Sequence, residues 1–137
     1  MVHLCLVFRN STGKPINLQF PPGLIFEAES IKVQNGMVVQ TASIEVPAKP
    51  VSYVPIMLDC TNVSRAPTAA AHGVPFRLGP VIRYPHIVEA LQLLADRDLS
   101  EPLDAAMAHA VLGELHDGDP LEGWMRQQIA DLPAKSS

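Results

Sequence analysis

The chain has 137 residues, enough for one domain that buries about two-thirds of the surface its unfolded chain would expose. Hydrophobic residues make up 47% and charged residues 18%, a balance that disfavours a disordered chain. The net charge of -4 comes without a basic block, so we expect no nucleic-acid partner. No run reaches the roughly 18–20 apolar residues of a membrane span, and we expect none.

Residues 1–65 are rich in Val, Ile, Leu and Thr and carry turn signals at intervals of about eight to twelve residues. This spacing predicts an antiparallel β-sandwich of about five to six strands. The first strand, residues 2–8, is apolar on both faces except at His3. Because a half-exposed strand alternates, we expect this one to be central or covered by a partner.

Turn residues divide the strands that follow. Residues 10–15 read as a turn, and Gly23 after Pro21-Pro22 supplies the positive φ of a type II turn. Asn35-Gly36 between two β-rich runs predicts a two-residue type I′ hairpin that sets Val33 opposite Val38, with a bulge near residues 28–30.

A further strand is expected over residues 51–59. Pro55 cannot donate a ladder hydrogen bond, so this strand should lie at an edge or be bulged there, and its alternation points Cys60 toward the core. Residues 66–84 form a connector, of which residues 74–78 should pair as an extra edge strand because Pro75 confines them there.

The strand half resembles the immunoglobulin-like domains of bacterial envelope and surface proteins. The resemblance rests on Pro21-Pro22-Gly23 and Val46-Pro47-Ala48 and covers about half of the chain. It implies a β-sandwich. The paired cysteines and tryptophan of the immunoglobulin core are missing, and a helical tail is foreign to that family.

From Pro85 onward the apolar period becomes helical, and residues 85–132 predict three short helices. The first, residues 85–95, should bury Ile87, Leu91 and Leu94. Ser100 should cap the second helix, and Asp119-Pro120 should begin the third. The expected buried stripe of the second helix is Leu103, Met107, Ala110, Val111 and Leu115; that of the third is Leu121, Trp124, Met125, Ile129 and Leu132. The predicted fold is therefore α+β, a single domain with an N-terminal sandwich and a C-terminal helical tail.

The sequence offers few candidates for catalytic or metal-binding residues. Cys5 and Cys60 either form one bridge or stay reduced, and a reactive Cys60 beside His72 or His86 would define a small Cys/His-dependent enzyme. No nucleophile-elbow or phosphate-binding glycine pattern occurs. His109 and His116 are seven residues apart, whereas joint chelation from a helix favours three or four. We therefore expect no metal, no cofactor and no enzymatic activity.

The remaining apolar surface favours a non-catalytic interaction or assembly module, either a homo-oligomer or a subunit of a larger complex or filament. The interface candidates are Leu4 and Leu6 on the first strand, and His109 and Leu112 on a second semi-apolar face of the middle helix. A carrier for a small apolar ligand between sheet and helices is a further alternative. We expect a cytoplasmic location if Met1 is the native start, and the cell envelope or secretion if a leader was removed.

Overall fold

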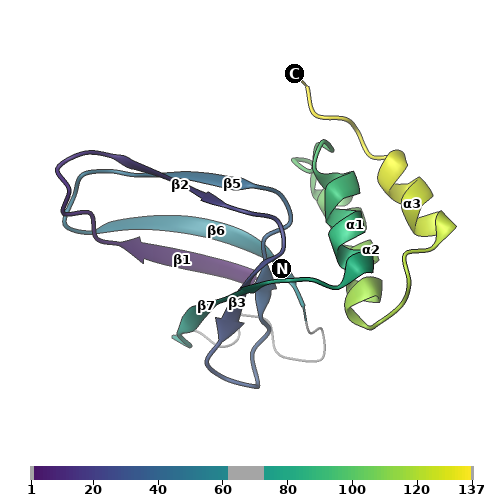
Figure 1. The fold of residues 1–137 in the computed structure, drawn as a ribbon, viewed down its shortest axis with the longest axis horizontal. Helices are drawn as coiled ribbons and strands as arrows, with labels where there is room; N and C mark the ends of the chain where they lie inside the picture. The colour runs from purple at the N-terminus through teal and green to yellow at the C-terminus, as the bar shows by residue number, and fades with distance from the viewer. Residues whose placement is uncertain (1, 62–72, 137) are drawn as a thin grey trace.

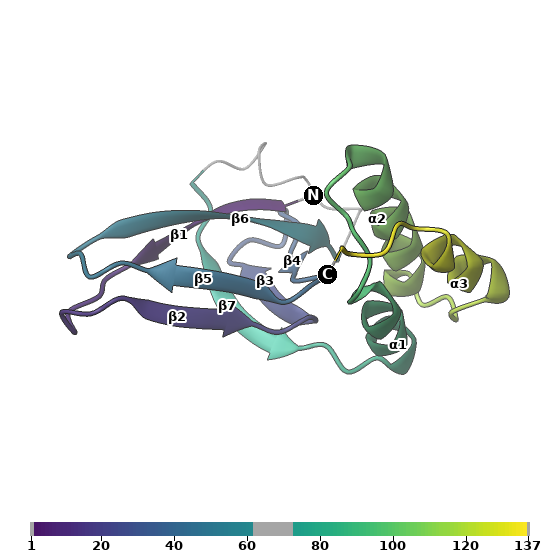
Figure 2. The same cartoon turned by 90° about the horizontal axis from the view of Figure 1, so that it is seen from above.

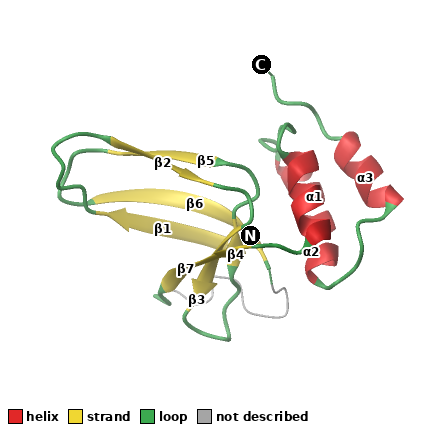
Figure 3. Ribbon diagram, viewed as in Figure 1, coloured by secondary structure: helices red, strands yellow, loops and turns green. Residues whose placement is uncertain are grey.

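A computed structural model describes residues 2–61 and 73–136 (Figure 1). Strands fill the N-terminal part of the chain and helices the C-terminal part, as the colouring by secondary structure shows (Figure 3). The predicted α+β order is confirmed. The described strands are β1 (Val2–Phe8), β2 (Ile16–Phe20), β3 (Leu24–Ala28), β4 (Gly36–Met37), β5 (Ala42–Val46), β6 (Ser52–Cys60) and β7 (Phe76–Val81).

The strands form two antiparallel sheets. One has five strands in the order β1-β6-β4-β3-β7, and the other pairs β2 with β5. Figure 1 shows β2 and β5 as a layer across from β1 and β6. Side chains of Leu4, Phe20 and Ile56 meet between these layers and pack against a buried cluster that includes Val2 and Leu58.

β1 has the predicted bounds, but it lies at the edge of its sheet. Its one neighbour among the described strands is β6, and the burial of its side chains alternates. Leu4 and Leu6 are half-buried, whereas Cys5 and Val7 are exposed. The expectation of a central strand is therefore wrong. Both faces of β1 are apolar in sequence, but only one of them packs against other described residues of the chain.

The predicted Asn35-Gly36 hairpin is also wrong. Gly36 belongs to β4, where it pairs with Phe26 on one side and Cys60 on the other, and its φ is not positive. A Cβ added at Gly36 would lie 2.5 Å from Cδ1 and 2.7 Å from Cβ of Leu58. Glycine is needed here for the close approach of two strands rather than for turn geometry. The bulge expected near residues 28–30 is replaced by a register shift between Leu24 and Phe26.

Other strand predictions are confirmed. Gly23 has φ +90°, and Leu24 donates a backbone hydrogen bond to the carbonyl oxygen of Pro21, as a type II turn requires. Pro55 lies where β1 is the only described neighbour of β6. Cys60 is buried, and the connector contributes an edge strand, β7, slightly later than predicted.

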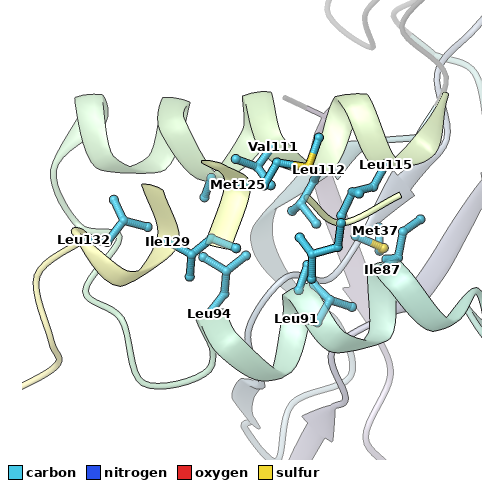
Figure 4. Close-up of a cluster of buried hydrophobic side chains, with 13 residues drawn as sticks. Met37, Ile87, Leu91, Leu94, Val111, Leu112, Leu115, Met125, Ile129 and Leu132 are labelled. Carbon is cyan, nitrogen blue, oxygen red and sulfur yellow. The ribbon is translucent and has the colours of Figure 1, made fainter. Parts of the chain in front are cut away.

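The helices are α1 (Pro85–Leu94), α2 (Pro102–His116) and α3 (Gly123–Ala130). In two perpendicular views they lie together at one end of the strand part (Figures 1 and 2). Their apolar faces converge in one buried cluster, drawn in Figure 4. The cluster takes Ile87, Leu91 and Leu94 from α1 as predicted, Met125 and Ile129 from α3, and Leu121 and Leu132 from beside α3.

The buried face of α2 differs from the predicted one. Ala108, Val111, Leu112 and Leu115 point into the core, whereas Leu103 and Met107 are exposed. The helix carries apolar residues around most of its circumference, so its partners decide which stripe is buried. Trp124 is likewise half-exposed rather than part of the α3 core face.

Two predicted helix starts are also corrected. The N-cap of α2 is Glu101 and that of α3 is Glu122, and neither makes a side-chain capping bond. Ser100 instead donates its backbone N–H to Oδ1 of Asp98, 2.9 Å away, in the turn before α2.

Consecutive residues join the two cores. Met37 packs into the helical cluster, and Val38 packs into the strand cluster. Because neighbouring side chains in an extended segment point to opposite sides, the chain at β4 connects both parts of the molecule.

Candidate functional site

The four residues predicted as interface candidates lie in three different environments. Leu4 and Leu6 are half-buried and face the strand core. Leu112 is fully buried in the helical cluster, so it is not available on the surface of this chain. His109 lies on the side of α2 that faces β6.

His109 contacts a buried carboxylate. Its Nδ1 forms a short hydrogen bond with Oδ1 of Asp59, fifty positions earlier in the chain. The Asp59 side chain is 2% exposed, and the His109 side chain is 31% exposed. The pair thus joins the C-terminal end of β6 to the middle of α2.

His116 completes the cluster from the same face of the helix, about two turns further along. Its Nε2 lies 3.4 Å from Oδ2 of Asp59. Both atoms are buried, and neither has a hydrogen-bond partner among the described residues. One carboxylate therefore faces two imidazoles in a part of the molecule with little access to water.

The position of Asp59 on β6 explains its burial. It alternates with Tyr53 and Met57 on the outward face of the strand, opposite to the face of Ile56 and Leu58. Tyr53 and Met57 stay exposed, whereas α2 contacts the C-terminal end of β6. The helix covers the end of the outward face and leaves the rest open.

Sequence reasoning placed Asp59 at a strand end and did not connect it with either histidine. The available signal was a single acidic residue at the end of a long apolar strand, followed by an inward Cys60. Because a buried charge requires a polar or charged partner, the position of Asp59 predicts that such a partner lies nearby.

The uncovered part of the outward face forms a continuous surface, which we name the outer β1–β6 face. Cross-strand pairs build it: His3 with Met57, Cys5 with Pro55 and Val7 with Tyr53. Val7 is 59% exposed, Tyr53 69% and Met57 58%. His3 is its only ionisable group apart from the tyrosine and the thiol.

Both cysteines are free, and only Cys5 is exposed. Cys60 is buried among strand residues. His86 accepts a hydrogen bond at Nδ1 from the backbone N–H of Leu121, 3.2 Å away, and contacts the ring of Tyr84. The described part of the chain thus shows no contact between Cys60 and His86, and His72 lies outside it.

Three further findings bear on function. Among the described residues, no group of three or more His, Cys, Asp and Glu side chains is arranged to hold a metal ion. No helix in residues 2–61 and 73–136 is long and apolar enough to cross a membrane. Comparison with protein-family models, curated proteins and solved structures gives no match, so the geometry of this chain carries the functional argument.

Proposed function

We propose that this chain is a non-catalytic assembly module that pairs with a second copy of itself along β1. The observation that carries the proposal is the edge of β1 that no other described strand pairs with, beside the outer β1–β6 face. Natural edge strands carry lysine, proline or bulges that prevent pairing. β1 has none of these, and His3 is its only titratable group besides Cys5.

The backbone of β1 offers hydrogen-bonding groups at its free edge. Thr61 donates its backbone N–H to the carbonyl oxygen of Asn35, on the β4 side of β6. By alternation, the nitrogen of Pro55 also faces that side, so Cys5 opposite it points its own N–H and C=O away from β6. His3 and Val7 share this direction.

A second copy is the simplest partner for such an edge. Two antiparallel β1 strands related by a two-fold axis present the same groups to each other. Full overlap of Val2–Phe8 places Cys5 at the centre, opposite Cys5 of the other copy. The pairing would extend the sheet and join the two exposed apolar faces.

Light scattering after size exclusion tests the proposal directly. We expect a mass of two chains at micromolar concentration, falling toward one chain on dilution. Val7→Lys introduces the charge that protects natural edges, and we expect it to give a monomer. Leu103→Lys, at an exposed site on α2, is the matched control and should leave the dimer intact. A mass of 14.8 kDa at every concentration would overturn the proposal.

Crosslinking at Cys5 tests the register. In a paired hydrogen-bonded position the Cα atoms are about 5.5 Å apart, within the range of about 4.4–6.8 Å for disulfides. Oxidation by air with a copper–phenanthroline catalyst should therefore give a covalent dimer through Cys5. Cys5→Ser should prevent it, and Cys60→Ser should not. A dimer in solution without this crosslink would place the interface elsewhere.

A further inference from the structure

A second feature of the molecule, lined by no residue of β1, has the properties of a small-molecule site. A cavity of about 290 Å³ lies between β6, α2 and residues 38–42, the segment that leads from β4 to β5. Its volume is near the lower end of ligand pockets, and an engineered apolar cavity about half as large binds benzene. Most of its wall is apolar, and the residues that line it include Val38, Ala42, Ile56, Leu58, Leu99 and Ala105.

Polar groups on the wall differ in their remaining hydrogen-bonding capacity. Gln40 uses its side-chain nitrogen to donate to the carbonyl oxygens of Leu94 and Arg97, at 2.7 and 2.8 Å. Asp59 is engaged with two imidazoles. The ring of His109 is partly exposed, and its Nε2 has no partner within the described residues. Oδ2 of Asp59 also lacks a hydrogen-bond partner, but it is buried beside His116. His109 is thus the partly exposed ionisable side chain on this wall with a free hydrogen-bonding atom.

The carboxylate of Asp59 determines what that atom can do. An ionised carboxylate only accepts hydrogen bonds, so Nδ1 of His109 carries the proton between them. In the neutral imidazole, Nε2 then holds a lone pair and accepts a hydrogen bond. While the imidazole is neutral, the ligand that suits the site has one donor group on a compact apolar body.

We propose that the cavity beside Asp59 and His109 binds a small apolar molecule with one hydroxyl group, which donates a hydrogen bond to Nε2 of His109. Asp59 is a positioning residue, because it holds the ring and selects the tautomer without contacting the ligand. This inference is independent of pairing along β1. No residue of β1 lines the cavity, although Ile56, Met57 and Leu58 of its wall pair with β1 on the other side of β6.

Para-cresol, toluene and benzoate test the proposal as probes of matched size in NMR titrations of the full chain. We expect para-cresol to bind about five- to tenfold more tightly than toluene, the value of one hydrogen bond. Shifts should appear at the His109 ring and the Ala105 methyl group. Equal affinity for para-cresol and toluene would remove the role of the hydroxyl. A preference for benzoate would show that Nε2 donates and would overturn the proposed hydroxyl ligand. No binding of any probe would overturn the site itself.

Variants of the cavity separate binding from folding. Ala105→Leu fills the cavity and should abolish binding of all three probes, whereas Ala106→Leu, exposed on the next position of α2, should not. His109→Phe should keep toluene binding and remove the preference for para-cresol. Retained para-cresol preference in His109→Phe, or retained binding in a folded Ala105→Leu protein, would contradict the proposal.

Asp59→Asn tests the tautomer. The amide nitrogen of asparagine can donate to Nδ1 of His109, which shifts the ring proton to Nε2 and makes this atom a donor. In the catalytic triad of serine proteases, the corresponding Asp-to-Asn substitution lowers activity because it stabilises the wrong tautomer of the histidine. We expect the affinity ratio of benzoate to para-cresol to rise at least about fivefold. An unchanged ratio in a folded Asp59→Asn protein would remove Asp59 from its positioning role.

Discussion

The helical core and the outer β1–β6 face contain similar apolar side chains with opposite fates. In the core, Leu94 and Leu112 have no exposed surface, because three helices converge on them (Figure 4). On the outer face, Val7 and Tyr53 are mostly exposed beside a strand edge that no other strand of residues 2–61 and 73–136 pairs with. An apolar sequence thus predicts which surfaces favour burial. The position of the helices decides which of these surfaces are buried within the chain.

The largest expected effect is the difference in stability loss between two truncations, one in each region. Leu112→Ala should lower the free energy of unfolding by about 2–5 kcal/mol, since a fully buried leucine leaves a cavity. At a protein concentration low enough to dissociate the proposed β1 pair, Val7→Ala should change it by less than about 0.5 kcal/mol, the usual range for an exposed position. Urea unfolding of both variants at one fixed protein concentration measures the difference.

Similar losses in the two variants would contradict this comparison. A large loss in Val7→Ala that grows at higher protein concentration would instead support the pairing of β1, because assembly stabilises the folded chain by mass action.

Two glycines give a second comparison of crowded and open positions. Gly36→Ala forces a Cβ into the side chain of Leu58, and we expect a loss of about 1–3 kcal/mol from overpacking. Gly113 lies inside α2, and a Cβ there meets nothing within 4 Å among the described residues. Gly113→Ala should therefore raise stability by about 0.5–1 kcal/mol through its helix propensity.

Thermal unfolding monitored by circular dichroism checks both substitutions. The informative result is that the two stability changes should have opposite signs. If Gly36→Ala were neutral, β4 and β6 would approach less closely than the structure indicates.

Gly36 also shows where sequence reasoning reached its limit. Asn-Gly has a strong local preference for a tight hairpin, but Leu58, more than twenty residues away, requires a residue without a side chain at this position. Local propensity cannot reveal a close approach between distant strands. By contrast, the turn at Gly23 was predictable, because its positive φ follows from three consecutive residues.

The candidate site was less accessible to sequence reasoning than the fold. The bounds of β1 and the core face of α1 follow from periodicity within one element. The contact of Asp59 with His109 depends on how α2 docks on β6, and no local pattern encodes this docking. The buried stripe predicted for α2 was right at Val111 and Leu115. It was wrong at its other three positions for the same reason, since the apolar residues of the helix allow more than one docking face.

The smallest expected effect concerns the surface ion pair between α1 and α3. Arg126 donates a short hydrogen bond to Glu89. This bond, together with the positive charge of Arg126, holds the pKa of Glu89 below its ordinary value. An acid with a lowered pKa stabilises the folded state above its unfolded pKa, and this contribution is lost as the pH falls through the folded value. Exposed pairs contribute little, so the helices should depend on their buried cluster far more than on this pair.

Arg126→Gln tests this ranking through two measurements. The pKa of Glu89, followed by carboxyl carbon NMR, should rise toward its ordinary value. Unfolding at neutral pH should change much less than in Leu112→Ala, and the small difference from the wild type should vanish in acid, where Glu89 is protonated in both proteins. Arg77→Gln is the matched control: Arg77 pairs with Glu27 at 2.9 Å between β7 and β3, so its loss should not affect Glu89. A loss of stability in Arg126→Gln as large as that in Leu112→Ala would mean that charge pairing, rather than the buried cluster, holds α3 against α1.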